Sequence, residues 1–331
     1  MGGGGEEGAC PGDTIQQEAP HVRNRFTAST NSFRLSMDKL GEKLRIKHEL
    51  GRALLGEFVG TAVLLLLINS IVAQSVLSRG KVNEMINLNI GIGLAIAFAV
   101  AICAKLSGGH VNPAVSLMFM TFGQLTPIAF VLYTLAQTAG AFFGSAFAFL
   151  VYFDAIDDFD GGVRHVIGPK ATASIFASYP AGYLSAFNGL IDQIVATAIF
   201  CLLIAHITDK RNSYPSWTQP LLIGASFAMI GTAFGLNCGY PVNPARDLGP
   251  RLFTLIIGYG ADVFSYRDYS WFWVPIVGPF IGAVIGACLY QLAIGIHTPS
   301  DPIETEVRKY DVATSQELKP LTATDKATIE P

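Results

Sequence analysis

The chain has 331 residues, of which 51% are hydrophobic and only 14% are charged, well below the usual quarter of a soluble domain. This composition argues against a soluble protein, and a formal net charge of −3 without a basic stripe excludes a nucleic-acid-binding surface. The five cysteines lie far apart and show no C-x-x-C spacing, which predicts free thiols, with neither a disulfide framework nor a metal site.

Apolar segments long enough to cross a bilayer recur along the chain, since a crossing helix needs roughly 20 apolar residues. The six predicted spans are 53–74, 86–106, 127–151, 187–207, 217–237 and 271–295. Three of them contain no charged residue, whereas Glu57 lies deep in the first span and Asp192 lies in the fourth. The first apolar run follows about fifty polar residues without a cleavage-site pattern, so we expect the first span, and no signal peptide, to direct insertion.

Two further apolar segments, 112–123 and 243–258, are too short to cross a bilayer, and each begins with Asn-Pro-Ala. Irregular backbone at membrane depth is tolerated only inside the protein, so these segments are predicted to be half-helices that re-enter the membrane. The predicted fold class is an all-α membrane protein with six transmembrane helices and two re-entrant half-helices.

An internal repeat relates two three-span units, at about 49–151 and 187–297. Its matching features are Glu57 with Thr61 and Gly140 with Gly144 in the first unit, and Gln193 with Thr197 and Gly278 with Gly282 in the second. In each unit the polar pair precedes Asn-Pro-Ala by about fifty residues, and the glycine pair follows it. Because three is odd, the second copy must insert upside down, and the two half-helices are expected to meet head to head at mid-membrane.

The orientation follows from Lys and Arg in the connections. The chain up to residue 52 contains eight of these residues, against two in the connection at 75–85. Since six spans return the chain to its starting side, we expect both termini in the cytoplasm. The polar tails 1–48 and 298–331 are predicted to be mobile and to flank a channel domain at 49–297.

The two Asn-Pro-Ala motifs are Asn112, Pro113 and Ala114 in the first unit and Asn243, Pro244 and Ala245 in the second. Asn is a favoured N-cap and Pro is favoured at the first helical position, so each motif begins a helix. With its side-chain oxygen used for capping, each Asn is expected to aim both amide hydrogens into a lumen. The positive ends of two facing helices would also repel cations and protons.

Two loops resemble the signature loops of the aquaporin family: residues 107–115, Ser-Gly-Gly-His-Val-Asn-Pro-Ala-Val, and residues 239–247, Gly-Tyr-Pro-Val-Asn-Pro-Ala-Arg-Asp. The similarity extends over about 50–297. Asp247 after the second motif and the long connection at 152–186 resemble the aquaglyceroporin branch. This resemblance implies a passive channel for water and glycerol in the plasma membrane, without a cofactor, assembled as a homotetramer with one pore in each subunit.

The family's outer constriction, carried over by spacing from the two Asn residues, corresponds to Ile92, Gly231, Tyr240 and Arg246. Arg246 would supply forked donors and repel cations. Gly231 would widen the passage or serve helix packing alone, and Tyr240 would offer an aromatic wall or simply pack. Ile92 stands where the branch often has an aromatic residue, which predicts a wider or less discriminating filter.

The resemblance gives Glu57 the role of a buried acceptor that holds a re-entrant loop, and a proton relay is the alternative for an intramembrane carboxylate. Gln193 at the matching position cannot titrate, which favours structural hydrogen bonding. Asp192 is expected in the bundle interior or at the lipid interface. His110 either lines the pore and gates it with pH or is a satisfied buried histidine, and Cys238 is a candidate for block by thiol reagents.

Three other functions are alternatives to a water and glycerol channel. A water-selective channel would need Tyr240 and Arg246 to close the passage, and Asp247 and Gly231 argue against it. A secondary transporter also uses inverted repeats, but it would need more ion-binding residues at mid-membrane than the sequence offers. An enzyme would need a nucleophile with its base or a metal cluster, and the sequence shows neither pattern.

Overall fold

The computed structural model describes residues 2, 34 and 37–299, so the predictions for the tails lie mostly outside the described residues. The chain divides into two compact units, Met1–His48 and Glu49–Pro331. In the first unit, residues 37–44 form a short helix. The second unit contains every helix discussed below.

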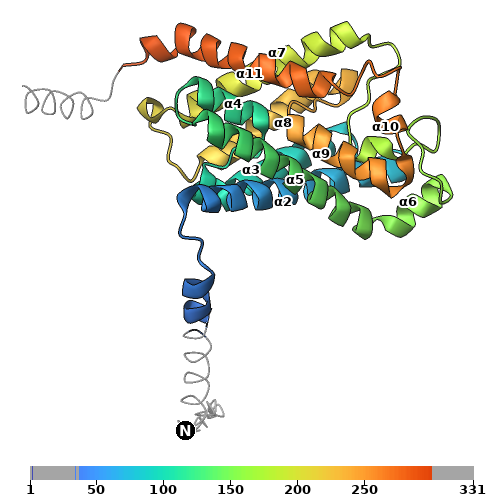
Figure 1. Ribbon diagram of the computed structural model, residues 1–331, viewed down its shortest axis with the longest axis horizontal. Coiled ribbons are helices and arrows are strands. Elements are labelled where there is room, and N and C mark those ends of the chain that lie inside the picture. The colour runs from blue at the N-terminus through green and yellow to red at the C-terminus, as the bar shows by residue number, and fades with distance from the viewer. Residues whose placement is uncertain (1, 3–33, 35–36, 300–331) are drawn as a thin grey trace, which may run out of the picture. The chain divides into compact units, whose positions relative to one another are not determined.

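Within its described residues the second unit is helical and contains no strand (Figure 1). Its six helices of membrane-spanning length are α2 (Glu49–Leu77), α3 (Met85–Ser107), α5 (Pro127–Val151), α7 (Ala186–Thr208), α8 (Gln219–Cys238) and α11 (Val274–Ala293). Two short helices are α4 (Pro113–Thr121) and α9 (Pro244–Thr254). The connections carry α6 (Phe153–Asp160), η1 (Ala173–Ile175), η2 (Lys210–Asn212), η3 (Leu255–Tyr259), α10 (Asp262–Ser265) and η4 (Gly295–His297). The predicted fold class of six spans and two half-helices is confirmed.

Local capping sets several helix ends. The Thr126 side chain accepts from the backbone N–H of Ala129 at 3.2 Å at the start of α5, where Pro127 occupies the first turn. The Ser185 side chain caps α7 in the same way. These side chains satisfy backbone donors that have no partner within the helix.

Glycines bring the long helices into close contact. A Cβ atom on Gly140 or Gly144 of α5 would overlap backbone carbonyls of α2, and a Cβ atom on Gly282 or Gly286 of α11 would overlap backbone carbonyls of α7. Only glycine permits this approach, as is common where membrane helices pack. Gly282 and Gly286 are therefore the counterparts of Gly140 and Gly144, and the expected match with Gly278 and Gly282 is wrong by one helical turn, although the repeat itself holds.

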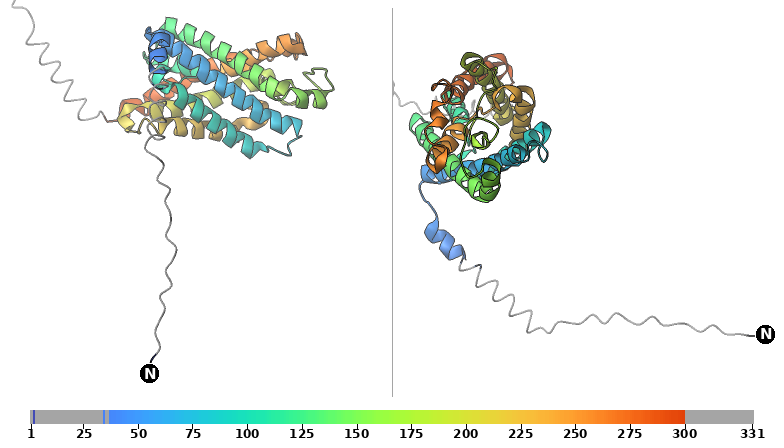
Figure 2. Two further views of the ribbon diagram at one scale, coloured as in Figure 1. Left: turned by 90° about the horizontal axis from the view of Figure 1, so that it is seen from below. Right: turned by 90° about the vertical axis from the view of Figure 1, so that its right-hand side faces the viewer.

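The half-helices α4 and α9 lie among the long helices, since each of them packs against both α5 and α11. The right-hand panel of Figure 2 shows the bundle end on, with long helices surrounding its centre. The first residues of α4 and α9 are buried. The two Asn-Pro-Ala motifs therefore lie inside the bundle, away from the lipid-facing surface.

Candidate functional site

The N-termini of α4 and α9 meet inside the bundle. The Oδ1 atom of Asn112 accepts from the backbone N–H of Ala114 at 2.9 Å. The Oδ1 atom of Asn243 accepts from Ala245 at 3.0 Å and from Arg246 at 3.1 Å. Both asparagines therefore cap their helices, with Pro113 and Pro244 in the first turn.

Each asparagine also bonds to the loop of the other half. The Nδ2 atom of Asn112 donates to the carbonyl of Val242 at 3.0 Å, and the Nδ2 atom of Asn243 donates to the carbonyl of Val111 at 2.9 Å. The expectation that both amide hydrogens of each asparagine face a lumen is therefore wrong, because a carbonyl of the opposite loop takes one of them. One amide hydrogen of each asparagine remains for a passing molecule.

A cavity at this junction is lined by residues of both halves. Its apolar lining includes Ile68, Ile92, Ile96, Phe200, Ile204 and Phe227. Its polar lining includes Asn112, Asn243, Arg246 and the loop segments 108–110 and 239–241. The cavity thus offers apolar surface and hydrogen-bonding groups together, which suits a small neutral molecule that has both carbon and hydroxyl groups.

The structure brings three of the four expected filter residues to this cavity, namely Ile92, Tyr240 and Arg246. Gly231 lies behind the Tyr240 ring, where an added Cβ atom would come within 2.6 Å of the ring carbon Cζ. The Tyr240 hydroxyl donates to Oδ1 of Asn89 at 2.7 Å. Gly231 therefore makes room for the tyrosine ring, and Asn89, three residues before Ile92 on α3, is a contact that the spacing did not indicate.

Substitution of Gly231 by alanine is expected to lower glycerol permeability about fivefold and water permeability less. The new methyl group must displace the Tyr240 ring, which would break the bond to Asn89 and push the ring toward the cavity. Vesicle swelling measures both permeabilities. Gly235→Ala is the matched control, because its Cβ atom would lie 3.3 Å from the same ring, a contact that a small shift relieves. Equal effects of the two substitutions would contradict this assignment.

Arg246 is 9% exposed, and its Nη1 atom donates to the carbonyl of Phe176 at 2.9 Å. Phe176 belongs to the long connection at 152–186, which thereby bonds to a residue that lines the cavity. The sequence drew attention to this connection only by its length. The bond itself was not predictable, because no local pattern shows that a backbone carbonyl will accept from an arginine 70 residues away.

Asp247 lies beside Arg246 but does not line the cavity. Its carboxylate accepts from the backbone N–H of Ser178 at 2.7 Å and from Nε of Arg251 at 2.8 Å. Arg251 in turn donates to the carbonyl of Ser178 at 2.7 Å. Asp247, expected only as a branch marker, therefore holds the loop that presents Phe176 to Arg246.

Glu57 is fully buried and accepts from three donors. Its oxygens lie 2.9 Å from the backbone N of His110, 2.7 Å from that of Val111 and 2.7 Å from Nε2 of Gln137. In the second half, Oε1 of Gln193 accepts from the backbone N–H of Val242 at 3.0 Å. Both side chains thus hold the turn that precedes an Asn-Pro-Ala motif, and this geometry favours the structural role of Glu57 over a proton relay.

His110 lines the cavity and is also packed, with its ring stacked on Phe119 at a centroid distance of 4.5 Å. Its Nδ1 atom lies 3.1 Å from the Ser116 hydroxyl. Cys238 is buried next to Gln193 and does not line the cavity, so a thiol reagent would have to displace neighbouring groups to reach it.

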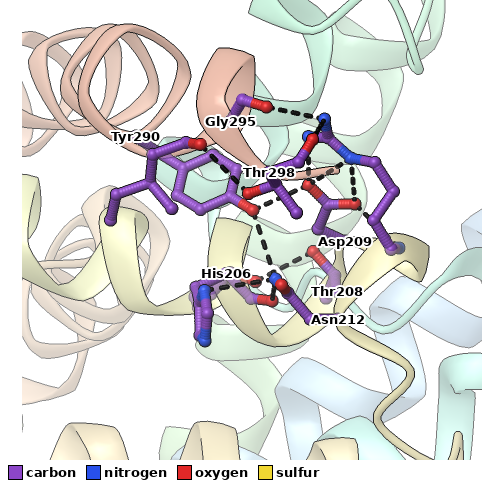
Figure 3. Close-up of polar contacts among 10 residues, drawn as sticks. His206, Thr208, Asp209, Asn212, Tyr290, Gly295 and Thr298 are labelled. Carbon is purple, nitrogen blue, oxygen red and sulfur yellow. Dashed lines mark hydrogen bonds and ion pairs between the residues drawn. The ribbon is translucent and has the colours of Figure 1, made fainter. Parts of the chain in front are cut away.

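A polar network joins the end of α7 to the end of α11 (Figure 3). The Asp209 carboxylate accepts from Nε of Arg211 at 3.0 Å and from the Tyr290 hydroxyl at 2.7 Å. Arg211 also donates to the carbonyl of Gly295 at 2.6 Å. Hydrogen bonding from Arg211 lowers the pKa of Asp209 to about 2. The network adjoins Thr208, which lines the cavity, so it fixes the ends of α7 and α11 next to that lining residue.

Replacement of Asp209 by asparagine is expected to lower the free energy of unfolding by about 1–2 kcal/mol, since a charged acceptor is lost. The pKa of Asp209 is lower in the folded chain than its unfolded value of about 3.9, so its contribution is complete above that pH and disappears as the pH falls toward about 2. The difference between the parent and the variant should be constant from about pH 8 to pH 5 and shrink below about pH 4. Thermal unfolding in detergent measures it, with the exposed Asp158→Asn as control. A difference that grows on acidification would be incompatible with this assignment.

Comparisons with known proteins agree with this geometry. Residues 45–290 match the model of the major intrinsic protein family. The chain is 42% identical over 329 residues to aquaporin-10 of Milnesium tardigradum, covering 93% of this chain and 80% of that protein. It is 42% identical over 280 residues to aquaporin-9 of Homo sapiens, covering 82% of this chain and 95% of that protein. Among solved structures, the aquaglyceroporin from Plasmodium falciparum matches with a TM-score of 0.67 and 30% identity, over 74% of this chain and 97% of that chain.

The chain belongs to the major intrinsic protein family. It is an integral membrane protein of the aquaporin fold, and its similarity to aquaporin-9, aquaporin-10 and an aquaglyceroporin confirms the branch indicated by the two signature loops. Proteins of this family are channels and not enzymes.

Proposed function

We propose that this passive channel for water and glycerol selects its solutes where Ile92, Tyr240 and Arg246 line the cavity. The lining of the cavity by both large apolar side chains and hydrogen-bonding groups supports this most strongly. The carbon atoms of glycerol can lie against the apolar lining residues while its hydroxyl groups bond to Arg246 and then to the free amide hydrogens of Asn112 and Asn243. Water uses the same donors in turn.

The same groups exclude ions and protons. The helices α4 and α9 direct their positive ends at the junction, and Arg246 adds a full positive charge in the cavity. Among the lining residues of the described chain, no carboxylate offsets that charge. A cation would therefore lose its hydration shell in a positive field, whereas a neutral solute would not be penalised.

The channel domain extends over 49–297 as two inverted repeats, 49–151 and 187–297. The excess of Lys and Arg in the N-terminal segment supports cytoplasmic termini. The plasma membrane is the location that the resemblance to the aquaporin family implies. Large apolar side chains such as Phe98 and Leu236 are 58% and 82% exposed, which suits contact with lipid or with other subunits. The assembly is a homotetramer, in which each subunit keeps its own pore.

Purified protein in liposomes tests this function directly. Shrinkage after a jump in an impermeant osmolyte reports water flux, and re-swelling after a glycerol jump reports glycerol flux. Both rates should lie well above those of empty liposomes. Ile92→Trp, which places a larger side chain at a lining position of the cavity, should lower both rates at equal protein content. Fast water flux with background glycerol flux would replace this function with that of a water-selective channel.

A further inference from the structure

The two re-entrant turns are held by different chemical groups. The Glu57 carboxylate accepts from the backbone N–H groups of His110 and Val111, whereas the Gln193 amide accepts from the backbone N–H of Val242. A carboxylate presents only acceptors, but an amide presents an oxygen on one side and two N–H donors on the other. The second turn is therefore held only when the Gln193 oxygen faces Val242.

Asp192 selects that orientation of the amide. Its Oδ1 atom accepts from Nε2 of Gln193 at 3.0 Å, and its Oδ2 atom accepts from Nδ2 of Asn237 at 2.7 Å. Asp192 is 7% exposed and Gln193 is fully buried, so water competes little for these bonds. If the Gln193 amide turned over, its oxygen would face a carboxylate and its NH2 group would face the Val242 N–H, which is unfavourable on both sides.

The remaining neighbour of the amide is the Cys238 thiol. Nε2 of Gln193 donates to its sulfur at 3.2 Å, and the thiol donates to Oδ1 of Asp192 at 3.5 Å. Because the carboxylate takes the thiol hydrogen, the sulfur presents only a weak acceptor to the amide. Asp192 is therefore the strong acceptor on the NH2 side of the Gln193 amide, and it also sets the direction of the thiol.

In the first half, the re-entrant turn is held without a neighbouring carboxylate that orients an amide. There, Nε2 of Gln137 on α5 donates to the Glu57 carboxylate at 2.7 Å. The position that corresponds on α11, three residues before Gly282, is Pro279, which has no polar side-chain atom. In the second half the carboxylate thus belongs to Asp192, one residue before Gln193, the residue that matches Glu57. Asp192 contacts the Gln193 amide, and that amide bonds to the turn at Val242.

These bonds reach the centre of the cavity. Val242 has a φ of +39°, in the left-handed region that a β-branched residue rarely adopts, so its turn depends on being held from outside. The carbonyl of Val242 accepts from Nδ2 of Asn112 at 3.0 Å. A shift of Val242 would therefore displace the central donor Asn112 as well as the second turn.

We propose that Asp192 is a positioning residue of the pore, which holds the second re-entrant turn and the Asn112 donor by orienting the Gln193 amide. The proposal rests on the function of that junction in conduction. Without Asp192 the amide is free to turn, and the donors at the junction lose their arrangement while the helices around them remain packed.

A two-residue cycle tests the proposal in liposomes with Asp192→Ala, Gln193→Glu and the double variant. Asp192→Ala should lower glycerol permeability about fivefold and change the ratio of glycerol to water permeability, since the amide loses its directing acceptor. Gln193→Glu alone should also impair flux, because it places a second carboxylate beside Asp192. The double variant should return to within about twofold of the parent, since one acceptor-only carboxylate then faces Val242, as in the first half.

Cys238→Ala is the control, because it removes the weak thiol contacts to the Gln193 amide and to Asp192 but keeps the bond between those two residues. It should change the permeability ratio less than about twofold. A parental ratio in Asp192→Ala, or a double variant no better than Asp192→Ala, overturns the proposal. If Asp192→Ala yields no folded protein, recovery of folded protein in the double variant supports the proposal, and its absence overturns it. Failure of the parent to conduct would instead contradict the function, and the thermal-unfolding midpoints of the four proteins would still decide the coupling of Asp192 to Gln193.

Discussion

Replacing Arg246 by alanine is expected to raise permeability to polyols larger than glycerol about tenfold, equivalent to about 1.4 kcal/mol, and to let protons leak across the membrane. The change removes a long side chain beside Tyr240 and a positive charge from a passage of low dielectric constant. The barrier that excludes larger polyols and the barrier that excludes protons therefore both fall. Vesicle swelling in a series of polyols and a pH-sensitive dye inside the vesicles measure the two effects.

Arg246→Lys separates those barriers. Lysine keeps the charge but lacks the planar fork that reaches the Phe176 carbonyl, so proton exclusion should persist while discrimination among polyols weakens. An unchanged polyol series in Arg246→Ala would place the constriction elsewhere along the cavity.

Replacing Glu57 by alanine is expected to remove most of the folded, conducting protein. Three buried donors lose their acceptor, and each unmet donor costs about 1–3 kcal/mol. The sum is comparable to the entire stability of a typical domain, about 5–15 kcal/mol. Yield of monodisperse protein in detergent and flux per reconstituted protein measure the loss.

A control for that substitution lies on the same helix. Gln74→Ala on α2 removes one exposed bond to the Tyr152 hydroxyl and should leave yield and flux close to those of the parent. Glu57→Gln should be intermediate, because an amide accepts from one backbone N–H while it presents a donor to the next. Parental yield and flux in Glu57→Ala would show that the first turn is held by other groups.

The spans and the half-helices were predictable because their signals are local. The length of an apolar run decides whether it can cross a bilayer, and α2 and α3 lie where the runs 53–74 and 86–106 predicted helices. Asn followed by Pro begins a helix for reasons contained in those two residues, and α4 and α9 begin immediately after Asn112 and Asn243.

The filter was only partly predictable. The family's spacing from the two Asn residues correctly placed Ile92, Tyr240 and Arg246 at one cavity, although they belong to α3, to the loop before α9 and to α9. Spacing could not show that Gly231 lies behind the Tyr240 ring, since the direction of a side chain depends on what packs against it.

The sequence by itself determined the number of spans, the duplicated motifs and the family, since these depend on hydrophobic length, capping and short residue patterns. Only the tertiary structure decided where the polar groups find their partners. Asn112 bonds to Val242 across 130 residues, and Asp192 acts on the second turn through Gln193. Such bonds join groups that are distant in the chain, and a buried donor bonds to whichever acceptor the packed helices bring next to it. No local sequence pattern indicates which partner a buried polar group will have.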